Sequence, residues 1–142
     1  MTSRNSTRFA LAATIAAVAS LISVGDVQAA RIENRVAVFS GIDKITGRIT
    51  QFDVYIGETV QFGALQVTPR VCYTRDETEA PKTTTFVEVD EITLDRTIRR
   101  IFTGWMFADS PALNAIEHAV YDVWLDNCKM ESDVPPPETA TN

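Results

Sequence analysis

The feature that most constrains the fold of this chain is an alternation of apolar and polar residues with a period of two. In the segment QFDVYIGE, the side chains of Phe52, Val54 and Ile56 fall on one face of an extended chain. The segments TFVEVDE and YDVWLDNC alternate in a similar way. Because successive side chains of a strand point to opposite faces, the pattern predicts β-strands that bury one face.

Turn-forming residues separate seven such segments. A hairpin is expected in VQFGALQV, where Gly63 can adopt the positive φ of the turn. No long amphipathic helix pattern is present, so the chain is expected to be all-β, a small antiparallel sandwich or barrel. The expected strands are Val36–Ser40, Arg48–Ile56, Thr59–Phe62, Leu65–Thr74, Thr84–Ile92, Thr97–Phe107 and Val120–Cys128.

One segment, SPALNAIEHAV, has helical character. Ser110 can cap a short helix whose first residue is Pro111. We expect this helix to cross over the ends of two neighbouring strands that contain GWMF and YDVWL, and Leu113 and Ile116 to fill the core from above.

The two ends of the chain differ from its centre. Residues 1–29 combine two arginines, an apolar run and small residues before Ala30, the layout of a signal peptide cleaved after Ala29. The apolar run is shorter than the ~20 residues of a spanning helix, which disfavours an uncleaved membrane anchor. Residues 131–142 are polar and rich in proline, which predicts a disordered tail. Residues 30–130 then form a single β domain.

The chain contains two cysteines, Cys72 and Cys128. In an exported domain of this size, such a pair predicts one disulfide. The alternative is a pair of reactive thiols, but the sequence contains no CxxC spacing and places no histidine beside either cysteine.

The balance of charge disfavours nucleic acid as a partner. Removal of residues 1–29 takes away two arginines and one aspartate and changes the formal net charge from −6 to −7. Nucleic-acid binding needs clustered cations. The one basic cluster, Arg96, Arg99 and Arg100, is expected to pair across strands with nearby acids.

The sequence offers no pattern typical of a metal or cofactor site. One histidine and two cysteines cannot supply the three or four ligands of a zinc site. The acidic segment EVDEITLD lacks the spacing and the glycine of a calcium loop, and we interpret it as a solvated strand edge. No phosphate-binding glycine loop or nicotinamide-binding motif is present.

Two sets of residues remain as alternative functional sites. Ser110 and His118, with a nearby acid, could form the triad of a small hydrolase, although no oxyanion-hole sequence accompanies them. Trp105, Tyr121 and Trp124 could form an exposed aromatic platform for a small ligand or a glycan; the other interpretation places these rings in the core.

Several longer segments resemble a known family. These segments are DKITGR, FGALQVTPRVCY, GWMFADSPALNAIEH and YDVWLDNC, and with their surroundings they cover Gly41 to Lys129. They resemble the secreted alphaproteobacterial proteins of domain-of-unknown-function family twenty-one fifty-five. The resemblance implies an exported, periplasmic protein of a Gram-negative bacterium and implies no activity or catalytic residue.

Together these observations favour a non-enzymatic envelope module without a cofactor. Its expected partner is a periplasmic protein or a cell-wall component.

Overall fold

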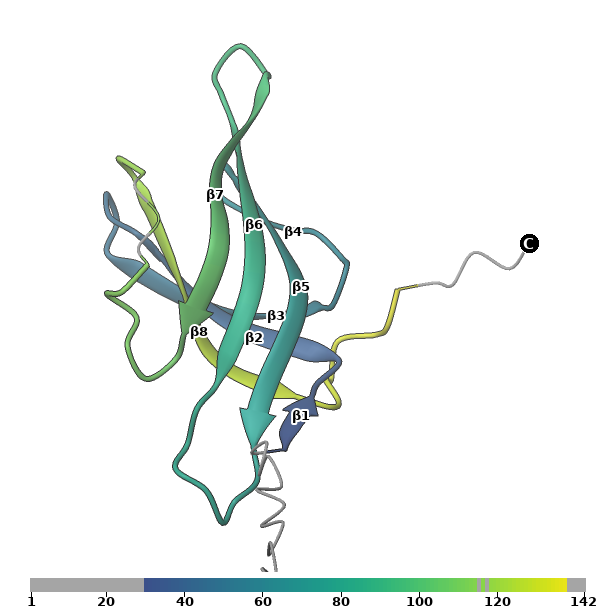
Figure 1. Ribbon diagram of the computed structural model, residues 1–142. Helices are drawn as coiled ribbons and strands as arrows, with labels where there is room; N and C mark the ends of the chain where they lie inside the picture. Colours follow the sequence, from purple (N-terminus) through teal and green to yellow (C-terminus); the bar gives the residue numbers. More distant parts are fainter. Residues whose placement is uncertain (1–29, 115, 117, 138–142) are drawn as a thin grey trace, which may run out of the picture.

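The computed structural model of the chain describes residues 30–114, 116 and 118–137, in which eight β-strands form (Figure 1). The seven predicted strands are confirmed, with ends that differ by at most three residues, and a short first strand was missed. The strands are β1 Arg31–Glu33, β2 Val36–Asp43, β3 Arg48–Tyr55, β4 Val60–Phe62, β5 Leu65–Arg75, β6 Thr84–Ile92, β7 Ile98–Phe107 and β8 Tyr121–Lys129.

The strands form two antiparallel sheets, which confirms the predicted all-β fold. The first sheet has the order β1-β5-β6-β7, and β4 pairs with β5 on the same edge as β1. The second sheet has the order β3-β2-β8. The strands of the two sheets cross in projection, and the hairpin of β6 and β7 extends beyond the second sheet (Figure 1).

The core lies between the inner faces of the two sheets. Phe39, Val54, Leu65, Val87 and Leu125 are each at most 1% exposed. Full burial of a side chain of this kind contributes about 1.5–3 kcal/mol to the stability of the fold. The alternation that predicted the strands therefore also determines which residues form the core.

The disulfide between Cys72 and Cys128 is present, as predicted. It joins β5 of the first sheet to β8 of the second, with a Cα–Cα distance of 5.7 Å. Both cysteines are buried. The Sγ atom of Cys128 lies 3.7 Å from the backbone oxygens of Tyr73 and Thr84, so the crosslink sits directly beneath the paired ends of β5 and β6.

The predicted hairpin at Gly63 is also confirmed. Gly63 has a φ of 57° and connects β4 to β5. A Cβ atom at this position would lie 2.3 Å from the ring of Tyr121. Both the conformation of the turn and the approach of this ring therefore require glycine.

The helical crossover is a correction to the sequence analysis. In the described part of the segment between β7 and β8, which lacks residues 115 and 117, turns replace the helix. The backbone amide of Leu113 donates to the carbonyl of Ser110, and Pro111 lies within that turn. A helix this short is marginal by itself, and the segment has to connect two different sheets.

The environment of the crossover was predicted only in part. Ile116 is buried, as expected, but Leu113 is 67% exposed. The strands β7 and β8 are not hydrogen-bonded neighbours, because β7 pairs with β6 and β8 pairs with β2. The pairing expected between GWMF and YDVWL was therefore wrong.

The acidic segment is the second correction. Its first five residues, 88–92, belong to β6, which pairs on both sides and is not an edge strand, and its last three lie in the turn before β7. Its acids bind the basic cluster: Arg99 lies 2.6 Å from Glu91, and Arg100 lies 2.5 Å from Asp90. The predicted cross-strand pairing is thus confirmed for Arg99 and Arg100.

The predicted signal peptide, residues 1–29, and the last five residues of the tail lie outside the described residues. The first part of the tail lies against β3, where Ser132 donates to Asp53 and the hydroxyl of Tyr55 donates to the carbonyl of Val134 at 2.7 Å. Within the described ranges, no helix has the length and apolar character needed to span a membrane.

Candidate functional site

The outer face of the first sheet carries a cluster of aromatic rings. Trp105 on β7 and Phe86 on β6 are direct cross-strand partners, and their rings meet edge to face with centroids 5.4 Å apart. The ring of Tyr73 on β5 stacks against Trp105 at 6.1 Å. The indole of Trp105 is 37% exposed, whereas the next residue, Met106, points into the core. The cluster therefore presents a fixed tryptophan to solvent.

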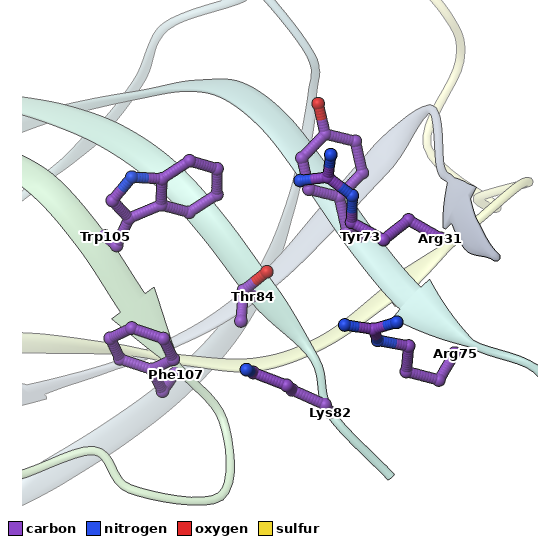
Figure 2. Close-up of a pocket in the computed structure, with 7 residues that line it drawn as sticks. All are labelled: Arg31, Tyr73, Arg75, Lys82, Thr84, Trp105 and Phe107. Atoms are coloured by element: carbon purple, nitrogen blue, oxygen red, sulfur yellow. The ribbon is translucent and has the colours of Figure 1, made fainter. Parts of the chain in front are cut away.

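Positive side chains lie beside these rings. The guanidinium of Arg31 lies over the ring of Tyr73, 5.0 Å from its centroid, a cation–π contact. Arg31 and Arg75 are direct partners in the pairing of β1 with β5. Lys82 enters from the segment that precedes β6 (Figure 2).

Rings and cations together line a pocket of about 260 Å³. Thr84 lies in the middle of the pocket, with Trp105 and Phe107 on one side and Tyr73 and Arg31 on the other (Figure 2). Ligand sites for whole small molecules are commonly about 300–1,000 Å³. A pocket of this size suits one large side chain or one ring of a longer partner.

The charge of the pocket contrasts with that of the whole chain. Arg75 pairs with Glu79 at 3.8 Å. Among the described residues, neither Arg31 nor Lys82 forms an ion pair with a carboxylate. The complete chain has a formal net charge of −6, so the pocket is a local positive region on an acidic protein.

The three aromatic residues considered as one platform do not come together. Trp124 alternates with buried Val123 and Leu125, which places it on the outer face of the second sheet. Tyr121 packs edge to face against Phe62, beside the core. Of the three, only Trp105 lines the pocket, and the rings are divided between the core and two outer faces.

His118 is held by contacts that do not involve Ser110. Its Nδ1 atom accepts hydrogen bonds from the backbone amides of Val120 and Tyr121, at 3.0 and 3.1 Å. Its Nε2 atom therefore carries the proton and donates to Glu91 at 3.1 Å. No hydrogen bond between described residues joins Ser110 to His118, so both ring nitrogens serve the local structure.

The carboxylate that binds His118 is also bound by an arginine. The hydrogen bond from Arg99 is the largest influence on the pKa of Glu91, which lies below its usual value, and the contact with His118 lowers it further. The residues described contain no cluster of three or more histidine, cysteine or acidic side chains that could hold a metal ion.

A second and larger hollow is lined in part by His118. It encloses about 720 Å³, its lining includes the exposed side chains of Ile45 and Leu94, and it contains no lysine or arginine. The two hollows therefore differ in chemistry: the larger combines apolar side chains with the acids Glu91 and Asp95, and the smaller combines rings with cations.

Most residues of the aromatic pocket were missed by the sequence analysis. Trp105 was proposed as a binding residue, but Tyr73, Arg31 and Lys82 were not. Arg31 joins these side chains only because β1 pairs with the end of β5, and Tyr73 and Lys82 come near Trp105 through the pairings of β5, β6 and β7. A three-residue strand carries no detectable alternation, so no pattern in the sequence indicated this pairing.

Comparisons with known proteins place the chain in a bacterial family. Residues 37–128 match the family model described as "Uncharacterized protein conserved in bacteria (DUF2155)". The chain is also similar to "Uncharacterized protein RP359" of Rickettsia prowazekii (strain Madrid E), with 23% identity over 87 residues. That match covers 61% of this chain and 56% of the relative, so the chain spans about half the length of the curated relative.

No solved structure matches the chain. The family match extends from β2 to β8 and includes both disulfide cysteines and the strands that carry Tyr73 and Trp105. The chain therefore belongs to the DUF2155 family of uncharacterized proteins conserved in bacteria.

Proposed function

We propose that this chain is an exported, non-enzymatic binding module of the bacterial cell envelope. Its partner is a periplasmic protein or a cell-wall component, and the partner binds at the pocket around Trp105. Three features support the proposal: the signal-peptide pattern of residues 1–29, the disulfide between the two sheets and the membership of a bacterial family.

The observation that carries the proposal is the fixed and exposed position of Trp105. Tryptophan, tyrosine and arginine are enriched among residues that dominate binding energy, and all three meet in this pocket. Contacts with Tyr73 and Phe86 orient the indole in advance. A partner would lose less conformational freedom at such a site than at a mobile side chain.

A glycan or another small ligand is the second candidate occupant. The exposed indole of Trp105 supports it, because an exposed aromatic face can stack on a flat ligand. In this version Trp105 acts without Trp124, which lies on the outer face of the other sheet.

The non-enzymatic assignment is supported by His118. Both of its ring nitrogens are engaged, by two backbone amides and by Glu91. A general base needs a nitrogen that can reach the proton of its nucleophile. A hydrolase that uses Ser110 is therefore the weaker proposal.

The binding test compares two tryptophan variants of the mature chain, residues 30–142. Wild type, Trp105→Ala and Trp124→Ala are crosslinked in periplasmic extract and, separately, cosedimented with purified cell walls. We expect one defined partner to be recovered by wild type and by Trp124→Ala, and lost with Trp105→Ala. Equal recovery by all three proteins, or recovery by none, would show that the pocket is not the binding surface.

A further inference from the structure

We propose that the pocket around Trp105 recognises an acidic peptide segment: a carboxylate next to an aromatic or long apolar side chain. The inference rests on the proposed function and adds the chemistry of the partner. The proposed ligand is a polypeptide, and equal binding of a free anion would count against it.

The cations of the pocket come from different parts of the chain. Arg31 on β1 is the direct cross-strand partner of Arg75 on β5. Lys82 lines the same pocket. Glu79 lies near Arg75, but Arg31 and Lys82 form no ion pair with a carboxylate among the described residues. An anionic group of a partner could therefore bind Arg31 and Lys82.

The pocket has two sides that differ in chemistry. Arg31 and Arg75 lie toward β1 and β5, and Trp105 and Phe107 on β7 form the opposite side (Figure 2). The amine of Lys82 points from the segment before β6 toward Phe107 (Figure 2). A ligand that fills the pocket therefore needs a negative group at one end and an apolar surface at the other. An acidic residue beside a phenylalanine or leucine has this form, whereas a bare inorganic anion leaves the rings without a contact.

The volume of the pocket and the net charge of the chain also favour a single acidic anchor segment. The pocket of about 260 Å³ holds one large side chain, which suits a single anchor residue of an extended peptide. Because the chain as a whole is acidic, an acidic partner gains attraction near this pocket but not from the net charge of the protein. The cations therefore supply specificity for the site more than general attraction to the protein.

The experiment measures the fluorescence of Trp105 in the mature chain with the substitution Trp124→Phe, which leaves one tryptophan. The probe is a five-residue peptide, blocked at both ends, with a central phenylalanine between two aspartates. Its controls are the same peptide with asparagines in place of aspartates, and inorganic phosphate.

Two double variants test the cations. Arg31→Gln with Lys82→Gln removes two charges from the pocket. Arg48→Gln with Arg96→Gln removes two exposed charges elsewhere and matches the change in net charge. We expect the acidic peptide to bind saturably, and the pocket variant to weaken its affinity by at least about tenfold. The control variant should change that affinity less than about twofold.

Three results would overturn the inference. These are equal binding of the aspartate and asparagine peptides, equal binding of phosphate and the acidic peptide, and unchanged binding by the pocket variant. A failure here is distinct from failure of the proposed function: if envelope crosslinking still depends on Trp105 but not on Arg31 and Lys82, the pocket binds a partner whose chemistry is not acidic.

Discussion

The outer face of the first sheet has two halves that use positive charge differently. In one half, Arg70 and Arg100 both lie close to Glu88, with N–O distances of 2.7 and 3.5 Å. In the other half, Arg31 lies against the ring of Tyr73. The first half, the ion-pair half, satisfies its charges internally, whereas the second, the pocket half, leaves cations available to a ligand.

The register of the strands produces this difference. In the ion-pair half, Asp90 is the direct partner of Arg100, so opposite charges meet across β6 and β7. In the pocket half, Phe86 is the partner of Trp105, and Thr84 is the partner of both Tyr73 and Phe107. One continuous sheet therefore carries a surface of internally paired charges and the proposed binding surface side by side.

Removal of the disulfide should lower the free energy of unfolding more than any other change. The pocket half should be affected most, because the crosslink lies beneath Tyr73 and Thr84. The crosslink closes a sequence separation of 56 residues, for which chain entropy predicts a loss of about 4 kcal/mol in the free energy of unfolding. The measurement is urea denaturation of wild type and of Cys72→Ala with Cys128→Ala. A loss below about 1 kcal/mol would show that the crosslink contributes little to stability.

The second prediction compares the exposed Trp105 with the half-buried Trp124. Trp105→Ala should weaken partner binding by about thirtyfold, equivalent to about 2 kcal/mol, because the indole is the central anchor. Its effect on stability should stay near 1 kcal/mol, since the side chain is partly exposed. Isothermal titration with the recovered partner measures the first value. A larger loss with Trp124→Ala would move the binding surface to the second sheet.

The third prediction separates the roles of charge in the two halves. Glu88→Gln removes the shared acid of Arg70 and Arg100 and should lower the free energy of unfolding by about 0.5–1 kcal/mol. Lys82→Gln should leave stability unchanged but weaken binding. Thermal unfolding and ligand titration of both variants check this crossed pattern. If both variants affect the same property, the two halves do not differ as described.

The smallest effect is expected from pH. A hydrogen bond from Arg99 holds the pKa of Glu91 below its usual value of 4.5. For Asp53, burial raises the pKa, but hydrogen bonds from Lys129 and Ser132 outweigh burial, so this pKa also lies below its usual value. The folded state therefore binds fewer protons than the unfolded state, and the stabilisation present above pH 4.5 is lost as the pH falls through the folded-state pKa values.

Melting temperatures measured from neutral to acidic pH test this dependence. Wild type should be nearly constant down to about pH 5 and then lose stability. Glu91→Gln should show a shallower loss, because one of the contributing carboxylates is absent. A rise in stability on acidification would contradict the assigned direction of the shifts.

The sequence predicted the strands well because alternation is a local property. The segment TTTFVEVDEI shows it clearly, and Thr84–Ile92 is a strand with the predicted bounds. The disulfide was also predictable, because the chain contains only two cysteines. The prediction of a helical crossover was wrong because the capping signal at Ser110 is local, whereas this segment has to connect two different sheets.

The candidate site could be predicted only in part, for a different reason. In GWMF, apolar residues occupy consecutive positions, so alternation does not say which of Trp105 and Met106 faces the core. The pairing of Phe86 with Trp105 decides it. The pocket also depends on Arg31, which reaches Tyr73 only through the pairing of β1 with β5. Both pairings are contacts between distant parts of the chain.

The most direct test of the central claim is a photocrosslink made inside living cells. A benzophenone-bearing phenylalanine replaces Phe107, which lines the same pocket, in one strain and Trp124 in another, and each strain is irradiated and analysed by mass spectrometry. We expect one reproducible envelope adduct from position 107 and none from position 124. An adduct from position 124 alone, or none from either position in folded and exported protein, would contradict binding at the pocket.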